Sequence, residues 1–308
     1  MSELLELIRS LEQAGRWAEI RTSGESFLAS ADASERARVL LALSKAWEET
    51  AAGVVDYRTA VRYTVATMDA AGAGSFLHVW ALHRLACQLS DLGDFAGAER
   101  AAQGFFAALP DHPRAEAVVP WVNFHMGRIR YHQRSYPEAA MWFERAAAAG
   151  DGELRERAVL FLVWARARAG HLAQAAEVLP ESVQHVSDGH LRAAKAFLYA
   201  CASDWPHAAQ EARSALRHFS AGEWRVFDIV QAAELCLILK NAAHAMGERS
   251  QAMAWMNKAA ALLSRWNLDL LVDLVLTLRV EGGGSIDAAA SHRGPAGHHR
   301  CGTRGSVG

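Results

Sequence analysis

Histidine and cysteine are the residues of this chain best suited to catalysis or metal binding. There are 14 histidines and 4 cysteines, but Cys87, Cys201, Cys236 and Cys301 stand far apart and the histidines are scattered. Metal coordination and nucleophilic catalysis need such groups at close, defined spacings, such as a C-x-x-C pair. We therefore expect the first three cysteines to be reduced, structural residues within apolar helices.

Sequence motifs of common enzymes are also missing. The chain has no Gly-Lys dipeptide, which excludes a phosphate-binding P-loop, and it lacks H-E-x-x-H, G-x-S-x-G and a strand-associated G-x-G-x-x-G. Because catalytic groups also assemble from distant positions, an enzyme stays our third hypothesis, behind two kinds of binding protein. We predict a protein that is not an enzyme and needs no cofactor or metal.

The charge balance and the hydropathy pattern bear on partners and location. Lys and Arg total 32 against 34 Asp and Glu, a formal charge of -2. No overall field would therefore hold a polyanion or an anionic membrane. The first residues lack the apolar run of a secretory signal, and no stretch reaches the ~18 apolar residues that a membrane span needs. We expect a cytoplasmic protein that binds neither nucleic acid nor membrane.

A repeated pattern organises most of the chain. The residue after each predicted turn is usually aromatic: Trp17, Tyr57, Phe95, Tyr136, Leu172, Trp205 and Arg249. Three residues later comes a small or apolar residue: Ile20, Ala60, Ala98, Ala139, Ala175, Ala208 and Ala252. Two residues before the first set stand Gly15, Val55, Gly93, Arg134, Gly170, Ser203 and Gly247. The units average roughly 39 residues, a length typical of helical repeats.

These positions predict a helix pair in each unit. Glycine ends the first helix because it adopts the left-handed conformation without steric cost. The aromatic residue closes the end of the pair, and the alanine lets two helix backbones approach closely. Asp56, Asp94, Ser135 and Asp204 are predicted to cap second helices, and Ser135 to Glu138 has the spacing of a capping box. The expected fold is an all-α superhelix of about seven helix pairs.

This pattern resembles the tetratricopeptide repeat, whose signature combines W-x2-L-G-x2-Y with A-x3-F and a closing proline. One unit, residues 120–150, supplies Met126-Gly127, Tyr131, Ala139 and Phe143 at A-x3-F spacing, and Ala146. The preceding unit supplies Leu85-Ala86, Leu89, Gly93, Ala98 and Pro110. The resemblance covers roughly residues 1–265 and implies a right-handed helical solenoid.

The units depart from that family in two ways, since most of them exceed 34 residues and they mostly lack the first tryptophan. Long, degenerate repeats of this kind resemble the sensor arms of bacterial regulators. HEAT-like repeats, which share the period but not the A-x3-F positions, are the lesser alternative.

The resemblance implies that first helices line a concave groove, as in other helical solenoids. Carrying the groove positions over unit by unit selects Trp80, His83, Trp121, Phe124, Arg128, Tyr131, Trp164, Arg168, Phe197 and Asn241. Aromatic rings and guanidinium groups suit the binding of a peptide. In the alternative interpretation the aromatic residues fill gaps between neighbouring pairs, and the polar residues form an ordinary solvated face.

Two functions follow from this reading. The first is a non-enzymatic scaffold that binds a segment of a protein or peptide in the groove. The second is a peptide-sensing module of a bacterial signalling or transcription system. Because the first repeat begins almost at Met1, we expect no DNA-reading helix-turn-helix ahead of it, which favours the scaffold.

The last forty residues are expected to differ from the repeats. We predict a helical-repeat domain over residues 1–281 and a disordered tail over residues 282–308, where glycine, serine and histidine dominate. Residues 268–280 are apolar around most of a helix, which predicts a self-association surface. In the tail, His292, His298, His299 and Cys301 lack the spacing of a metal site.

Overall fold

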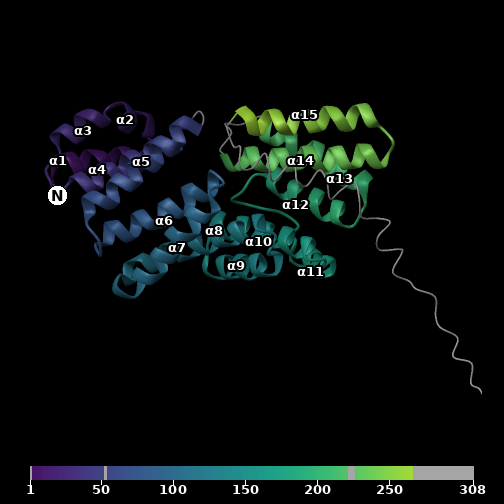
Figure 1. Ribbon diagram of the computed structural model, residues 1–308, viewed down its shortest axis with the longest axis horizontal. Coiled ribbons are helices and arrows are strands. Elements are labelled where there is room, and N and C mark those ends of the chain that lie inside the picture. Colours follow the sequence, from purple (N-terminus) through teal and green to yellow (C-terminus); the bar gives the residue numbers. More distant parts are fainter. Residues whose placement is uncertain (1, 52–53, 221–225, 266–308) are drawn as a thin grey trace, which may run out of the picture.

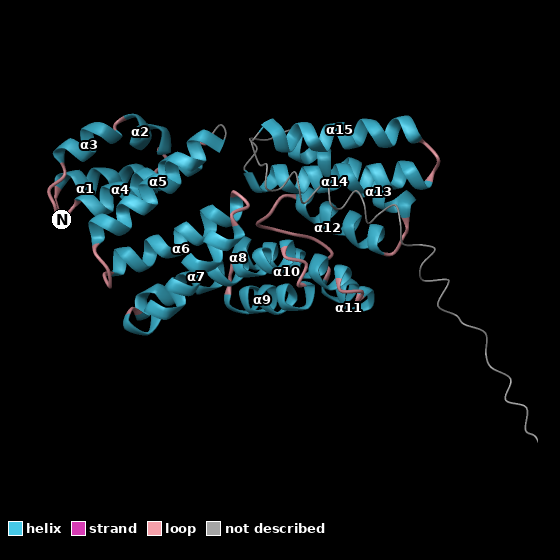
Figure 2. Cartoon of the chain, in the orientation of Figure 1, coloured by secondary structure: helices cyan, strands magenta, loops and turns pink. Residues whose placement is uncertain are grey.

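A computed structural model describes residues 2–51, 54–220 and 226–265, and every regular element in these ranges is a helix (Figure 2). The elements are α1 (Glu3–Gln13), α2 (Trp17–Thr22), α3 (Gly24–Ser30), α4 (Arg36–Glu49), α5 (Val54–Ala71), α6 (Phe76–Asp91), α7 (Phe95–Ala108), the 3-10 helices η1 (Leu109–Asp111) and η2 (Pro113–Val118), α8 (Val119–His132), α9 (Tyr136–Ala149), α10 (Gly152–Arg168), α11 (Leu172–Val178), α12 (Asp188–Cys201), α13 (Trp205–Ser220), α14 (Val226–Ala245) and α15 (Arg249–Arg265). The predicted self-association surface and tail, residues 268–280 and 282–308, lie outside the described residues.

Within the described ranges the helices form seven antiparallel pairs in chain order. The first pair is α1 with the short helices α2 and α3, and the others are α4 with α5, α6 with α7, α8 with α9, α10 with α11, α12 with α13 and α14 with α15. Six of the seven residues predicted to follow a turn begin a second helix. Tyr57 is the exception, because α5 already begins at Val54. The prediction of an all-α fold of about seven helix pairs is confirmed.

Before six of the seven second helices, all except α5, the position two residues ahead of the helix takes the left-handed backbone conformation. Gly15, Gly93, Gly170 and Gly247 have φ between 65° and 85° there. Arg134 and Ser203 adopt the same conformation, with φ of 63° and 61°. A residue with a Cβ is strained in this region. The turn geometry of the repeat therefore prevails over the local preference of these two residues.

We expect Ser203→Gly to stabilise the protein by about 0.5 to 1 kcal/mol. Relief of the left-handed strain, about 1 to 2 kcal/mol, outweighs the extra backbone entropy of glycine in the unfolded chain. Urea unfolding followed by circular dichroism measures the change. Ser203→Ala, which keeps the Cβ, should give no gain; equal stability of the two variants would contradict the assignment.

The alanine positions lie in the packed interior of the array. Every residue of the series from Ile20 to Ala252 is buried. In the fourth pair Phe143 of α9 packs against Gly127 of α8, where an added Cβ would lie 2.5 Å from the Phe143 ring. The A-x3-F spacing thus places an aromatic ring directly against a helix that has no side chain at that point.

Two glycine-to-alanine changes within helices should therefore have opposite effects. Gly127→Ala should destabilise the protein by about 1 to 2 kcal/mol, because overpacking against Phe143 exceeds the gain in helix propensity. Gly104→Ala in α7 should stabilise it by about 0.5 to 1 kcal/mol, since its Cβ would meet only Leu82 at an ordinary 3.4 Å. Thermal melting of both variants tests this difference, and a shift of the same sign in both would refute it.

The predicted helix caps are confirmed in two of four cases. Asp94 accepts a hydrogen bond from the Gly97 amide at 2.9 Å, and Asp204 accepts one from the His207 amide at 3.4 Å. The capping box at Ser135 is wrong: its side chain makes no cap hydrogen bond, and Glu138 pairs instead with Arg130 at 3.2 Å. Asp56 lies within α5 and pairs with Arg21 of α2.

First helices occupy the inner side of the array. In Figure 1 the chain runs from α1–α5 through α6–α11 and turns back up to α12–α15. The first helices contact one another in series, from α4 to α6, α8, α10, α12 and α14, whereas successive second helices make no comparable contact within the described ranges. Convergence of first helices is what curvature towards their side produces. None of the described helices is both long and apolar enough to cross a membrane.

Candidate functional site

The ten predicted groove residues all lie on first helices, but the structure divides them by exposure. Trp121 of α8 and Arg168 of α10 are exposed, and Trp80 of α6 and Asn241 of α14 are half-buried. The other six are buried: His83, Phe124, Arg128, Tyr131, Trp164 and Phe197. The inner wall therefore exposes some of the predicted residues to solvent and buries the others.

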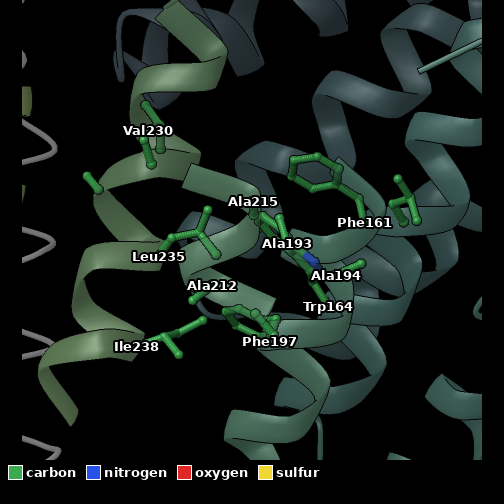
Figure 3. Close-up of a cluster of buried hydrophobic side chains, with 14 of the residues drawn as sticks. Phe161, Trp164, Ala193, Ala194, Phe197, Ala212, Ala215, Val230, Leu235 and Ile238 are labelled. Atoms are coloured by element: carbon green, nitrogen blue, oxygen red, sulfur yellow. The ribbon is translucent and has the colours of Figure 1, made fainter. Parts of the chain in front are cut away.

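Buried rings form a continuous cluster along α8, α10 and α12. The ring centroids of Phe124 and Phe161 are 5.3 Å apart, those of Phe161 and Trp164 are 4.8 Å apart, and Trp164 stacks on Phe197 at 5.0 Å (Figure 3). Their burial agrees with the packing interpretation. Direct contact of these rings with a partner stays a prediction.

Exposed groups stand at both ends of this cluster. Trp121 lies 6.5 Å from Phe124 and is 36 % exposed. At the other end the Arg168 guanidinium lies over the Phe197 ring, 4.7 Å from its centroid, in a cation–π geometry, and Arg168 as a whole residue is exposed. A partner reaching the inner wall would meet these two side chains first.

Phe76 extends the exposed aromatic surface, although it was not among the predicted groove residues. Its ring lies 5.6 Å from Trp80, one helical turn away in α6, and it is 38 % exposed. Helix α6 also contacts η2, the segment that leads into Trp121. We call Phe76, Trp80 and Trp121 the aromatic edge, because all three lie near the N-terminal ends of neighbouring first helices. The signal for Phe76 was its spacing of four residues from Trp80.

Arg128 is an interior ion-pair residue. Its guanidinium pairs with Asp91 of α6 and lies 3.3 Å from the Nδ1 atom of His125. Asp91 also accepts a hydrogen bond from the Tyr57 hydroxyl at 2.7 Å. Burial alone would raise the pKa of the Asp91 carboxyl, but Arg128, His125 and Tyr57 together hold it below its usual value. This cluster links α5, α6 and α8.

A second polar network joins α4, α5 and α6. The Gln88 side-chain amide donates to Ser44 at 3.0 Å and to Glu48 at 2.8 Å, and it accepts from Thr64 at 2.8 Å. Arg84 donates to the same Glu48 carboxylate at 2.6 Å. Burial raises the pKa of Glu48 although Arg84 opposes the shift. Satisfied buried networks of this kind fix a single arrangement of neighbouring helices.

The array curls far enough for α14 to meet the inner wall of α8 and α10. A small pocket of about 10 Å³ lies between them, lined by Arg128, Tyr131, His132, Phe161, Trp164, Val230, Gln231 and Glu234. Burial raises the pKa of Glu234 to about 7, although Arg168 and Arg128 attract its negative form. Gln231 and Glu234 were not predicted; the signal available was a polar pair three residues apart in an apolar helix.

The described residues offer no group of three His, Cys, Asp or Glu side chains placed to hold a metal ion. Three free cysteines lie within them, and burial raises the pKa of the Cys87 and Cys201 thiols. A protonated thiol is a poor nucleophile and a poor ligand. The fourth cysteine, Cys301, lies outside the described residues.

These features define a curved array of helix pairs whose inner wall carries aromatic and charged side chains. No protein-family model and no curated protein matches the chain. Solved structures do: a tetratricopeptide repeat protein from Parabacteroides merdae has a TM-score of 0.58 at 15% identity over 89% of this chain and 98% of its own. A Rap protein complexed with competence and sporulation factor has a TM-score of 0.60 at 14% identity over 83% of this chain and 73% of its own. The chain has the tetratricopeptide-like repeat fold.

Proposed function

We propose that this protein is a non-enzymatic scaffold that binds a segment of another protein or a peptide along its inner wall. The aromatic edge carries this proposal. Phe76 and Trp121, both more than a third exposed, stand beside Trp80 at the ends of two adjacent first helices. Aromatic side chains that the fold leaves in water are typical centres of protein interfaces.

The wall beneath the aromatic edge is rigid, which favours binding. The two polar networks and the buried ring cluster tie α4, α5, α6, α8, α10 and α12 together. A preorganised surface loses little conformational entropy when a segment docks on it. In this proposal Trp80 and Trp121 contact apolar side chains of the partner, and Arg168 contacts an acceptor group.

Selection from a phage-displayed peptide library, followed by calorimetric measurement of Kd, tests the proposal. Trp121→Ala should weaken binding of the selected peptides about tenfold or more, as removal of a central aromatic contact typically does. Arg168→Glu should weaken it as well. Arg128→Glu is unsuitable, because it would place a second carboxylate against Asp91 in the interior.

Met253→Ala on α15 is the matched control, since Met253 is an exposed apolar residue on a second helix. It should leave Kd unchanged. Peptides that bind the Trp121→Ala, Arg168→Glu and Met253→Ala variants as tightly as the parent would place the binding surface elsewhere. Failure to select any peptide would argue against segment binding altogether.

The runner-up function is a peptide-sensing regulatory module. The similarity to a Rap protein complexed with competence and sporulation factor favours it. Mass spectrometry of material that co-purifies from the native host separates the two functions. A short peptide would support the sensor, and a stoichiometric larger protein would support the scaffold.

A further inference from the structure

Helix α14 covers part of the inner wall. It contributes Val230, Gln231 and Glu234 to the pocket whose other side is formed by α8 and α10. Tyr131 and Trp164, two of the predicted groove residues, lie on that other side and are 5 % and 2 % exposed. While α14 is in place, a segment docked on the wall therefore cannot reach these two side chains.

The contact of α14 with α8 and α10 is less complete than its other contacts. Within the part of the chain that the structure describes, the Trp164 Nε1 atom and the Gln231 Oε1 atom have no hydrogen-bond partner in the protein. The pocket of about 10 Å³ beside them has room for one water molecule. On another face of α14, Leu235 and Ile238 point towards the α12–α13 pair and pack in the apolar core (Figure 3).

This difference makes α14 separable from the wall. Its main neighbours are α12, α13 and α15, and the apolar packing on them does not involve α8 or α10. In an array of stacked pairs, a small rotation at each junction accumulates into a larger displacement. Such rotations would lift α14 from α8 and α10 while each helix pair stays intact.

Glu234 makes the contact sensitive to charge, because its side chain is half-buried within it. The ionisable groups that face it are Arg128, Tyr131 and His132 of α8 and Arg168 of α10. Burial raises the pKa of Glu234 to about 7, although both arginines attract its negative form. Burial also lowers the pKa of His132 to about 3 and raises the pKa of Tyr131 well above its ordinary value. Of these groups only Glu234 changes charge between pH 5 and 8.

We propose that α14 is a pH-dependent cover of the inner wall, which lies over α8 and α10 while Glu234 is protonated and moves away from them when Glu234 ionises. The preference for the covered arrangement is complete below pH 4.5 and is lost as the pH rises through about 7. Opening adds Tyr131 and Trp164 to the surface on which a segment docks. The opening itself is independent of the proposed binding function, and only its use by a docked segment rests on that function.

Hydrogen exchange of the Trp164 indole N–H measures the opening, followed by NMR of protein labelled with ¹⁵N in its tryptophan indoles. The exchange rate, divided by that of free indole at the same pH, reports how often the side chain is uncovered. This ratio should rise at least ~10-fold between pH 5 and pH 8 in the parent, because ionised Glu234 favours the open arrangement. It should stay constant in Glu234→Gln, which gains no charge.

Trp164→Phe assigns the indole signal by its loss. If that variant does not fold, the contact of the indole with the Phe197 ring, whose centroid is 5.0 Å away, assigns it instead. Glu177→Gln, which replaces an exposed carboxylate on α11, is the matched control and should show the same rise as the parent. A ratio that does not change with pH in the parent, or that rises equally in Glu234→Gln, would overturn the proposal.

The cover and the scaffold fail in different ways. If Trp164 exchange rises with pH but no library peptide is selected, the cover stands and the scaffold function falls. If selected peptides need Trp121 but Trp164 exchange does not depend on pH, the scaffold stands and the cover falls.

Discussion

Asp91→Ala should destabilise the protein by about 3 to 5 kcal/mol, the largest effect expected of any single change considered for this chain. Asp91 ends α6, accepts from the Tyr57 hydroxyl of α5 at 2.7 Å and pairs with Arg128 of α8, whose side chain is 3 % exposed. Removal of the carboxylate takes a counter-charge from a buried guanidinium, which is far more costly than loss of a surface pair. Three successive helix pairs would lose their shared contact.

Chemical unfolding monitored by circular dichroism measures this loss. Asp91→Asn should give an intermediate loss, since the amide oxygen still accepts from Tyr57 but the negative charge is gone. Glu153→Ala is the matched control: Glu153 pairs with Arg157 at 2.6 Å on the exposed face of α10, where such pairs contribute about 0.5 kcal/mol. A loss below about 1 kcal/mol for Asp91→Ala would show that the cluster does not hold the pairs together.

The same cluster has a defined dependence on pH. The pKa of Asp91 in the folded protein lies below its ordinary value of 3.8. Its contribution to stability is therefore complete above that ordinary value and is lost as the pH falls through the lower pKa of the folded state. Parent and Asp91→Asn should differ most near neutrality and converge in strong acid.

Local chemistry explains why the helix pairs could be predicted from the sequence. A left-handed turn residue, an aromatic residue and an alanine lie within six positions of one another, so a single short segment carries the whole signal. Arg134 and Ser203 take the same left-handed conformation as the glycines, so the turn is kept even where the residue does not favour it locally. Tyr57 lies one turn inside α5 and belongs to one of the three units, the second, fifth and seventh, in which the pattern is weak; there Val55 stands at the glycine position.

The environment of each inner-wall residue could not be predicted in the same way. Arg128 and Asp91 are 37 residues apart, and nothing in the spacing of either shows that α6 and α8 bring them together. The helical spacing of aromatic residues predicts an inner face. It does not show which of these rings are buried within the wall and which are exposed on its surface. Exposure separates Trp121 from Trp164, and exposure depends on how neighbouring pairs stack.

The contact between α14 and α8 is even harder to predict from the sequence. It results from the rotation accumulated over three helix pairs, and a small change at each junction would separate the two helices. Gln231 and Glu234 therefore reach Arg128, Tyr131 and Trp164 only once the successive helix pairs have stacked. Two polar residues in the apolar sequence of α14 indicate a specific role, but the sequence does not show which helices they face.

Glu234→Gln should make the protein more stable at pH 8 while leaving it nearly unchanged at pH 5. Glu234 faces Arg128, Tyr131 and His132 on α8 and Arg168 on α10. Burial raises the pKa of Glu234 from 4.5 to about 7, and the two arginines only partly offset this effect. The carboxyl is thus protonated in the folded protein at a pH at which it is ionised in the unfolded chain.

The sign of the effect follows from linkage. Because the pKa of the folded state is raised, the stability associated with protonated Glu234 is fully present below pH 4.5 and is lost as the pH rises through about 7. A pKa shift from 4.5 to about 7 corresponds to about 3 kcal/mol at most. The free energy of unfolding of the parent should therefore fall by about 2 to 3 kcal/mol relative to Glu234→Gln by pH 8. Of the other groups at the site, burial lowers the pKa of His132 to about 3, and burial raises the pKa of Tyr131 well above its ordinary value, so neither changes charge in this range.

Urea unfolding of parent and variant at a series of pH values between 5 and 8 measures this difference directly. Glu177→Gln, which replaces an exposed carboxylate on α11, should keep the pH profile of the parent. A stability difference between parent and Glu234→Gln that is the same at every pH would mean that Glu234 is solvated in the native state. In that case α14 would not cover the inner wall in solution, because the pocket that surrounds Glu234 is formed by α14 together with α8 and α10.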